Sequence, residues 1–179
     1  MKAINNSEEK LPLEQLVSKL KDEDIKYSKL SKSLLYIYVV LIGFYAIATL
    51  LLFIFERHSN QFYGAICYLV SFIIFAILFR QYYKEYKSVD YSLPTIQMLK
   101  QAAYRYKPFQ WRLLWLLLVI GIIDAGFTLT VDFHFSFWTT QMFILGVFAL
   151  AFVIGIIYWR VRYKPLRDNV LHLIKEIES

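Results

Sequence analysis

Four long apolar blocks, separated by polar segments, dominate the hydropathy pattern of the chain. They cover roughly residues 34–55, 62–79, 111–131 and 137–159, and the first contains no charged residue. An α-helix rises about 1.5 Å per residue, so about twenty apolar residues cross a hydrocarbon core of ~30 Å. The pattern therefore predicts four transmembrane helices, of which the second is short.

The polar segments between and beside these blocks contain three amphipathic helical patterns. Their apolar positions recur at helical spacing: Leu13, Leu16, Val17 and Leu20; Ile96, Leu99, Ala103 and Tyr106; Leu166, Val170, Leu173, Ile174 and Ile177. Each apolar face must be covered by the membrane surface, by the other two helices or by a partner. The predicted fold class is all-α, a four-helix transmembrane bundle with three cytoplasmic amphipathic helices.

The same boundaries divide the chain into five parts. We expect an amphipathic N-terminal segment over 1–33, a first transmembrane hairpin over 34–79 and a connector helix over 80–110. A second transmembrane hairpin over 111–159 and a C-terminal helix over 160–179 complete the chain. About thirty polar residues precede the first apolar block, which argues against a secretory signal peptide and predicts an uncleaved anchor.

Charge predicts the orientation. The net charge is +6, and nineteen of the twenty Lys and Arg residues lie in the N-terminal segment, the connector counted through Arg112 and the C-terminal tail; the exception is Arg57. Basic residues collect on the cytoplasmic side of membrane proteins, so both termini are expected in the cytoplasm, with the protein in a bacterial inner membrane. The basic character needs no nucleic-acid partner, and no nucleic-acid-binding motif is present.

The two halves of the chain share features that suggest a parallel tandem repeat of two-span units. Leu11-Pro12 followed by Gln15 corresponds to Leu93-Pro94 followed by Gln97, and Ile42-Gly43 to Ile120-Gly121; the acidic-x-His turns and the basic ends of the spans also correspond. Each half then consists of an amphipathic helix, a span, a turn and a span. Chance matching between apolar sequences is the alternative.

Asp124 is the candidate functional residue within the membrane. It is the only ionisable residue well inside an apolar block. Placing a carboxylate at the middle of a bilayer costs a free energy of roughly 2.5–3.5 kcal/mol. It shares a predicted helical face with Gly121 and Thr128, so we expect it to point into the bundle. The alternatives are that Asp124 is protonated, forms a hydrogen bond with Tyr45, Thr49 or Ser71, or pairs with another protein. It could also have a purely structural position near the outer water.

Other chemistry is sparse. Glu56, His58, Asp132 and His134 in the two outer turns form a nominal zinc set, although nothing fixes their geometry and a metal site is not the favoured interpretation. Cys67 has no second thiol and is interpreted as a small apolar residue. No phosphate loop, nucleophile elbow or CxxC motif is present, so we expect no enzyme activity and no cofactor.

Small residues and amphipathic faces indicate interactions. Gly121 with Ala125, and Ala151 with Gly155, have the small-xxx-small spacing that lets membrane helices approach closely, between spans or between copies. The candidate docking residues lie on the amphipathic faces: Leu16, Leu99, Leu166, Val170 and Leu173. Mutual packing of the three helices is the competing expectation. Membrane lipid and a protein partner, or a second copy of the chain, are the expected partners.

Residues Val89-Asp90-Tyr91-Ser92-Leu93-Pro94, followed by Ile96-Gln97 and a basic stretch to Pro108, carry a resemblance to a known group. The chain resembles small four-span bacterial integral membrane proteins in which a hydrophobic-Asp-Tyr-Ser-x-Pro turn opens an amphipathic helix between two span pairs. The resemblance implies a role beside extracytoplasmic-function sigma factors for some members. The N-terminal segment of about 33 residues is short for a complete sigma-binding domain.

Two functions follow as hypotheses. The first is a non-enzymatic integral membrane interaction or regulatory protein that presents its cytoplasmic helices to a partner. The alternative is a small transporter or channel subunit that uses Asp124 in its permeation path.

Overall fold

The fold was analysed in a computed structural model that describes residues 12–55, 59–107, 111–130 and 137–178. Within these residues the chain forms five α-helices and no strand, which confirms the all-helical prediction. The helices are α1 (Leu13–Phe55), α2 (Asn60–Lys87), α3 (Thr95–Arg105), α4 (Arg112–Thr130) and α5 (Phe137–Glu178).

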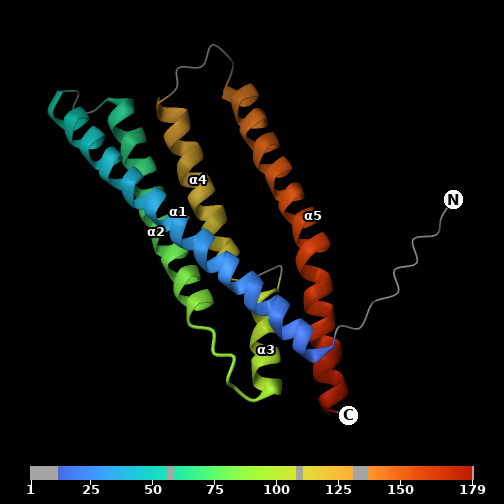
Figure 1. The fold of residues 1–179 in the computed structure, drawn as a ribbon. Coiled ribbons are helices and arrows are strands. Elements are labelled where there is room, and N and C mark those ends of the chain that lie inside the picture. The colour runs from blue at the N-terminus through green and yellow to red at the C-terminus, as the bar shows by residue number, and fades with distance from the viewer. Residues whose placement is uncertain (1–11, 56–58, 108–110, 131–136, 179) are drawn as a thin grey trace.

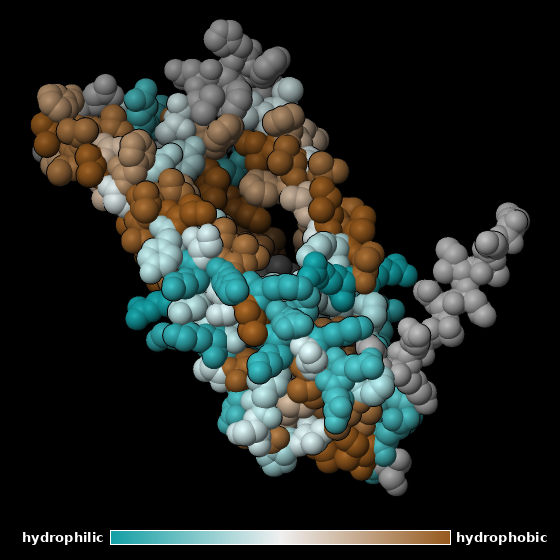
Figure 2. All heavy atoms as spheres, viewed as in Figure 1, coloured by the Kyte–Doolittle hydropathy of each residue, from teal (hydrophilic) through white to brown (hydrophobic). Residues whose placement is uncertain are grey.

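Three of the helices, α1, α2 and α5, are long and apolar enough to cross a membrane. The apolar part of α4, Leu114–Thr130, is shorter. Figure 2 shows the corresponding division of the surface: apolar side chains cover one half of the molecule and a hydrophilic band covers the other. The fold is therefore compatible with a transmembrane protein that carries a polar domain on one side.

The first and last amphipathic segments are not separate helices, because α1 and α5 continue without a break from the apolar half into the polar half. These helices contain 43 and 42 residues, and α5 runs through Pro165. A proline inside a helix removes one backbone hydrogen bond and costs about 3 kcal/mol. Tyr163 and Leu166 on either side of it are buried against other helices, and this burial offsets the cost.

The helices pack unevenly in the apolar half. α1 and α2 lie against each other as an antiparallel hairpin, α2 also packs on α4, and α5 packs little on α4, which it meets through a hydrogen bond from Gln141 to Thr128 (Figure 1). Aromatic rings fill the α1–α2 contact: Tyr38 stacks on Phe75 with 4.9 Å between ring centroids, and Tyr45 meets Tyr68 edge-on at 5.5 Å. The two predicted hairpins therefore differ in packing, whatever their sequence relationship.

Two glycines set the contact between α2 and α4. A Cβ atom at Gly64 would collide with the side chain of Thr130, and one at Gly126 would lie 3.0 Å from the Cβ of Cys67. The space around the predicted Gly121 and Gly155 is open instead. Within the chain, the close approach of α2 and α4 therefore occurs at Gly64 and Gly126 and not at the two pairs that the spacing suggested, because the spacing does not specify which face meets a neighbour.

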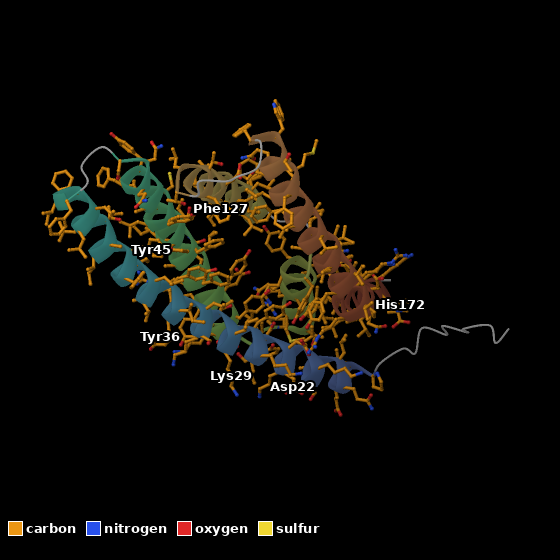
Figure 3. The ribbon with its side chains drawn as sticks, turned by 90° about the horizontal axis from the view of Figure 1, so that it is seen from above. Asp22, Lys29, Tyr36, Tyr45, Phe127 and His172 are labelled. Atoms are coloured by element: carbon orange, nitrogen blue, oxygen red, sulfur yellow. The ribbon has the colours of Figure 1, made fainter. Side chains whose placement is uncertain are left out.

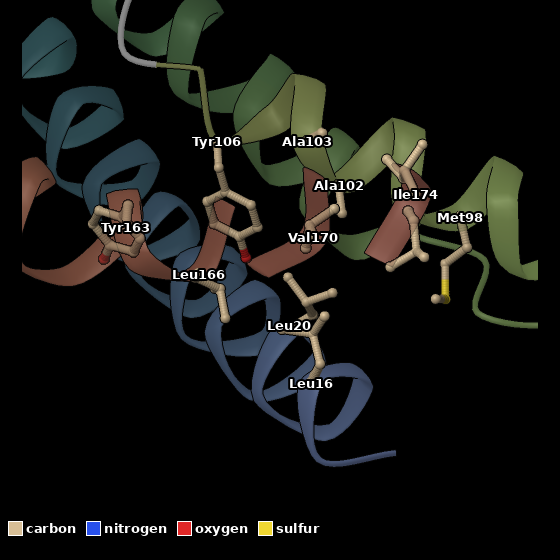
Figure 4. Close-up of a cluster of buried hydrophobic side chains, with 11 residues drawn as sticks. Leu16, Leu20, Met98, Ala102, Ala103, Tyr106, Tyr163, Leu166, Val170 and Ile174 are labelled. Atoms are coloured by element: carbon tan, nitrogen blue, oxygen red, sulfur yellow. The ribbon is translucent and has the colours of Figure 1, made fainter. Parts of the chain in front are cut away.

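The polar half is a compact assembly that we call the cap, consisting of residues 12–31, 88–107 and 159–178. Its interior contains side chains from α1, α3 and α5, which converge in Figure 4. Leu16, Leu20, Leu99 and Val170 are fully buried there. Seen from above in Figure 3, Asp22 and Lys29 lie on the opposite, outer side of α1. The amphipathic faces of the three segments therefore cover one another.

Candidate functional site

A buried carboxylate forms the centre of the cap. Asp24 of α1 is 2% exposed and accepts three hydrogen bonds from charged or phenolic donors. Its Oδ2 accepts from Arg105 Nη2 at 3.0 Å and from Tyr91 Oη at 2.5 Å, and its Oδ1 accepts from Tyr106 Oη at 2.9 Å. Because both oxygens are occupied, this group, which we call the Asp24 hub, acts as a clamp between segments far apart in sequence.

The clamp depends on the hydrogen bonds that the Asp24 carboxylate accepts. Burying an ion pair removes two charges from water, and the cost is offset only when the geometry is good and the remaining polar atoms are paired. The side chains of Arg105 and Asp24 are 7% and 2% exposed, so water contributes little. The two phenols provide the additional donors that a buried carboxylate needs.

The phenols of the hub are held in their protonated form. Burial, followed by the hydrogen bond to Asp24, raises the pKa of Tyr91 above its usual value. Burial and the negative charge of Asp24 raise the pKa of Tyr106 in the same direction. An ionised phenolate beside the carboxylate would place two negative charges together, so both residues remain hydrogen-bond donors.

The Asp-Tyr-Ser-x-Pro turn has a defined structural role, which is to deliver Tyr91 to the hub. Asp90 Oδ1 accepts hydrogen bonds from Ser92 N at 2.8 Å and from Ser92 Oγ at 2.6 Å, which closes an Asx-turn. These bonds lower the pKa of the Asp90 carboxyl. Leu93 packs against the cap interior, and Pro94 immediately precedes α3, where a missing N–H is tolerated. Each polar residue of the motif thus shapes or clamps the turn.

Further contacts join α5 to the hub helices. Trp159 Nε1 donates to the backbone oxygen of Tyr106 at 3.1 Å, which satisfies a carbonyl at the C-terminus of α3. Arg162 Nη2 lies 2.8 Å from Glu23 Oε1, one residue before Asp24. Burial alone would raise the pKa of Glu23, but its hydrogen bonds to Arg162 and Lys26 more than offset this and lower it.

The candidate docking residues lie inside the cap. Leu16, Leu99, Leu166 and Val170 are buried, and Leu173 is half-buried and packs against the same cluster. In this conformation they therefore contact one another and do not form an open surface for a partner. The alternative expectation, mutual packing of the three helices, describes the observed arrangement.

Asp124 lies half-buried on α4, where its carboxylate Oδ1 is buried and has no hydrogen-bond partner within the described part of the chain. Two of the three expected hydroxyl partners donate elsewhere: Thr49 donates to the backbone oxygen of Tyr45, and Ser71 to that of Cys67. One turn along α4, Thr128 accepts a hydrogen bond from Gln141 of α5 at 3.1 Å.

The nominal zinc ligands Glu56, His58, Asp132 and His134 fall outside the described residues. Across the ranges that the structure does describe, no group of three or more His, Cys, Asp or Glu side chains is arranged to hold a metal ion.

The apolar periodicity alone does not indicate the hub, because Asp24 is charged and directly follows Asp22 and Glu23 in the sequence. The signal was present in the helical spacing: Asp24 follows Leu16 and Leu20 at intervals of four residues, so it belongs to the buried face. Arg105 likewise follows Ala102 at an interval of three on the buried face of α3.

No family model matches the chain, and neither a curated protein nor a solved structure gives a significant match. The resemblance carried by residues 89–94 therefore stays a prediction. Functional inference rests on the cap, the Asp24 hub and Asp124.

Proposed function

We propose that the protein is a non-enzymatic integral membrane interaction or regulatory protein whose cap engages a protein partner in the cytoplasm. The observation that carries this proposal is the continuity of α1 and α5 from the apolar half into a cap clamped by the Asp24 hub. A folded polar domain built on the ends of membrane helices is suited to present a surface to soluble proteins.

A four-span topology with both termini cytoplasmic is part of the proposal. α3 lies in the cap, whereas α5 begins at the opposite end of the molecule, so α4 leads the chain from one side to the other (Figure 1). Its 19 residues correspond to about 28 Å of helix, close to the thickness of a hydrocarbon core. Nineteen of twenty Lys and Arg residues fall on the cap side in this arrangement, which favours a bacterial inner membrane with the cap inside.

The packed state of the cap determines where a partner can bind. Four of the five predicted docking residues are enclosed and Leu173 is half-buried, so the partner meets either outward-facing side chains or faces released when the cap opens. Exposed apolar residues on the outside of the three helices include Ile25 (44%), Tyr104 (61%) and Leu171 (41%). We propose that the partner binds this outer surface.

Site-specific photo-crosslinking in native membranes tests the proposal. Probes placed at Ile25, Tyr104 and Leu171 report on the outside of the cap, and matched probes at Leu16, Leu99 and Val170 report on its interior. One recurrent foreign protein on the outer probes supports the proposal, once its complex with the whole chain has been purified. The same adduct on interior probes shows instead that the partner uses the predicted faces of an opened cap. Adducts only to lipid and to the chain itself, at all six positions, overturn the proposal.

The buried Asp124 Oδ1, with no hydrogen-bond partner within the described ranges, favours a second candidate function. A small transporter or channel subunit would use this carboxylate as a titratable group in its permeation path. Proton uptake into liposomes that contain the purified protein and a pH-sensitive dye measures this activity. The candidate requires uptake by the wild type and its loss in Asp124→Asn; equal uptake by both, or none by the wild type, removes it.

A further inference from the structure

A cavity of ≈ 350 Å³ lies between the cap and the apolar helices, beside the Asp24 hub. Its wall includes residues from α1, α2, α4 and α5 and from the C-terminal end of α3. The volume falls within the range of about 300–1,000 Å³ that is typical of small-molecule sites. It therefore has the size of a binding site and not of a packing defect.

The lining of the cavity has two chemically different parts. Leu34, Phe75 and Leu116 come from the apolar stretches of three helices, whereas Arg105 and Lys107 bring positive charge from the cap. The lining residues that the structure describes include no carboxylate. Arg105 is balanced by Asp24, so Lys107 leaves the rim with a net positive charge. An apolar wall below a cationic rim matches an amphiphile with an anionic head.

The position of the cavity favours a ligand that arrives from the bilayer. Trp159 and Tyr82 line it, and aromatic residues with a polar tip are typical of the depth at which lipid headgroups lie. α5 packs little on α4 apart from the Gln141–Thr128 hydrogen bond, and Figure 2 shows the surface hollowed between the apolar arms, next to the hydrophilic band. A lipid chain can therefore enter the cavity sideways without leaving an apolar environment. A free anion or a soluble peptide has no such route, because it would have to cross the apolar region.

We propose that this cavity binds an anionic phospholipid of the leaflet on the cap side, with an acyl chain against the apolar wall and the phosphate at Lys107. The phenol of Tyr27 also lines the cavity, but its hydroxyl is hydrogen-bonded to Tyr163, so the phosphate contact is assigned to Lys107 alone. The same lipid would touch α1, α2, α4 and α5 together with the end of α3. The inference does not depend on the proposed partner-docking function.

Quenching of Trp159 fluorescence by brominated lipids tests the proposal. Trp159 lines the cavity and is held by its hydrogen bond to Tyr106. The full chain with Trp111, Trp115 and Trp138 replaced by Phe carries this single tryptophan. It is reconstituted into vesicles of phosphatidylcholine with increasing fractions of brominated phosphatidylglycerol or, in parallel, of brominated phosphatidylcholine. We expect the anionic lipid to quench at the lower fraction.

Matched variants locate the site of quenching. Lys107→Gln should reduce the preference for the anionic lipid about fivefold, since one Lys near an anionic lipid surface contributes a free energy equivalent to that factor. Lys100→Gln removes the same charge from α3 at a position outside this cavity and should leave the preference intact. Ser31→Leu fills the cavity from a buried position and should weaken quenching, whereas Ser33→Leu, at an exposed position two residues away, should not.

Two results overturn the proposal. Equal quenching by both brominated lipids in the wild-type background excludes an anionic-lipid site, and a preference that Lys107→Gln leaves unchanged places the lipid elsewhere. Circular dichroism and the emission maximum of Trp159 establish that each variant is folded. If Ser31→Leu does not fold, the comparison of Lys107→Gln with Lys100→Gln decides the question alone.

Discussion

The cap and the apolar bundle share the helices α1 and α5 but are held together in different ways. In the cap, Leu16, Leu99 and Val170 are completely buried, and an ion pair lies among them. In the bundle, large apolar side chains face outward; Val40 is 71% exposed and Phe143 is 73% exposed. Water drives apolar side chains together, whereas lipid does not. The cap therefore needs a core, and the bundle needs only local close contacts.

The largest effect that this comparison predicts is the loss of the carboxylate in the hub. Asp24→Ala leaves Arg105 charged and buried without that partner, which should destabilise the cap by about 3–5 kcal/mol. Thermal unfolding in detergent, followed by the fluorescence of Trp159 in the background with Trp111, Trp115 and Trp138 replaced by Phe, measures the change. The double variant Asp24→Leu/Arg105→Met should recover most of the loss, since it removes both charges. A double variant as unstable as the single one would mean that packing, and not charge, holds this part of the cap.

Removing apolar volume from the cap should have the next largest effect. Leu99→Ala creates a cavity where the side chain is fully buried, and such changes cost about 2–5 kcal/mol. Leu171→Ala provides the matched control, because this residue is 41% exposed and its truncation should change stability by no more than about 0.5 kcal/mol. Both are measured by the same unfolding assay. Similar losses for the two variants would contradict a core composed of the three inward faces.

In the bundle, a smaller change should act by steric collision. Gly64→Ala places a methyl group against Thr130 of α4, and overpacking of this kind costs about 1–3 kcal/mol. Gly43→Ala is the control, since no atom lies within 4 Å of the added Cβ and alanine improves helix propensity. In unfolding measurements in detergent, Gly64→Ala should therefore lower the stability, whereas Gly43→Ala should raise it slightly. Equal behaviour would show that α2 and α4 do not approach at Gly64.

The smallest predicted effect is electrostatic and depends on pH. The folded state lowers the pKa of Glu23 from its usual 4.5, so its contribution is complete above that value and is lost as the pH falls through the lowered pKa. The unfolding midpoints of the wild type and Glu23→Gln should therefore differ at neutral pH and converge between about pH 5 and pH 3. A constant difference would assign the effect to packing of the side chain instead of its charge.

Much of the fold was predictable from periodicity alone. Apolar blocks of span length and amphipathic faces such as Leu166, Val170 and Ile174 are properties of local sequence, and the structure places these three side chains in the cap interior. The continuity of α5 was not predictable in the same way. Pro165 suggests a boundary by its own propensity, and only the burial of its neighbours in a tertiary core keeps the helix intact.

The hub was harder to predict than the fold because it is assembled from three distant segments. Spacing places Asp24 on a buried face, but nothing local shows that Arg105 and Tyr91 arrive there from 81 and 67 residues away. The same limit applies to glycine: the spacing of Gly121 and Ala125 suggests a contact, yet the close approach is at Gly64 and Gly126. Pairings of this kind depend on the arrangement of whole helices.

The uninterrupted length of α1 and α5 couples the apolar half mechanically to the cap. Helices of 43 and 42 residues extend about 65 Å, roughly twice the hydrocarbon thickness. A helix whose hydrophobic stretch no longer matches a thinner bilayer tilts. Because nothing breaks these helices where they leave the apolar half, such a tilt must bend them or load the contacts at Glu23, Asp24 and Trp159. If the apolar half lies in a bilayer, a change in bilayer thickness would reach the cap as strain across these contacts.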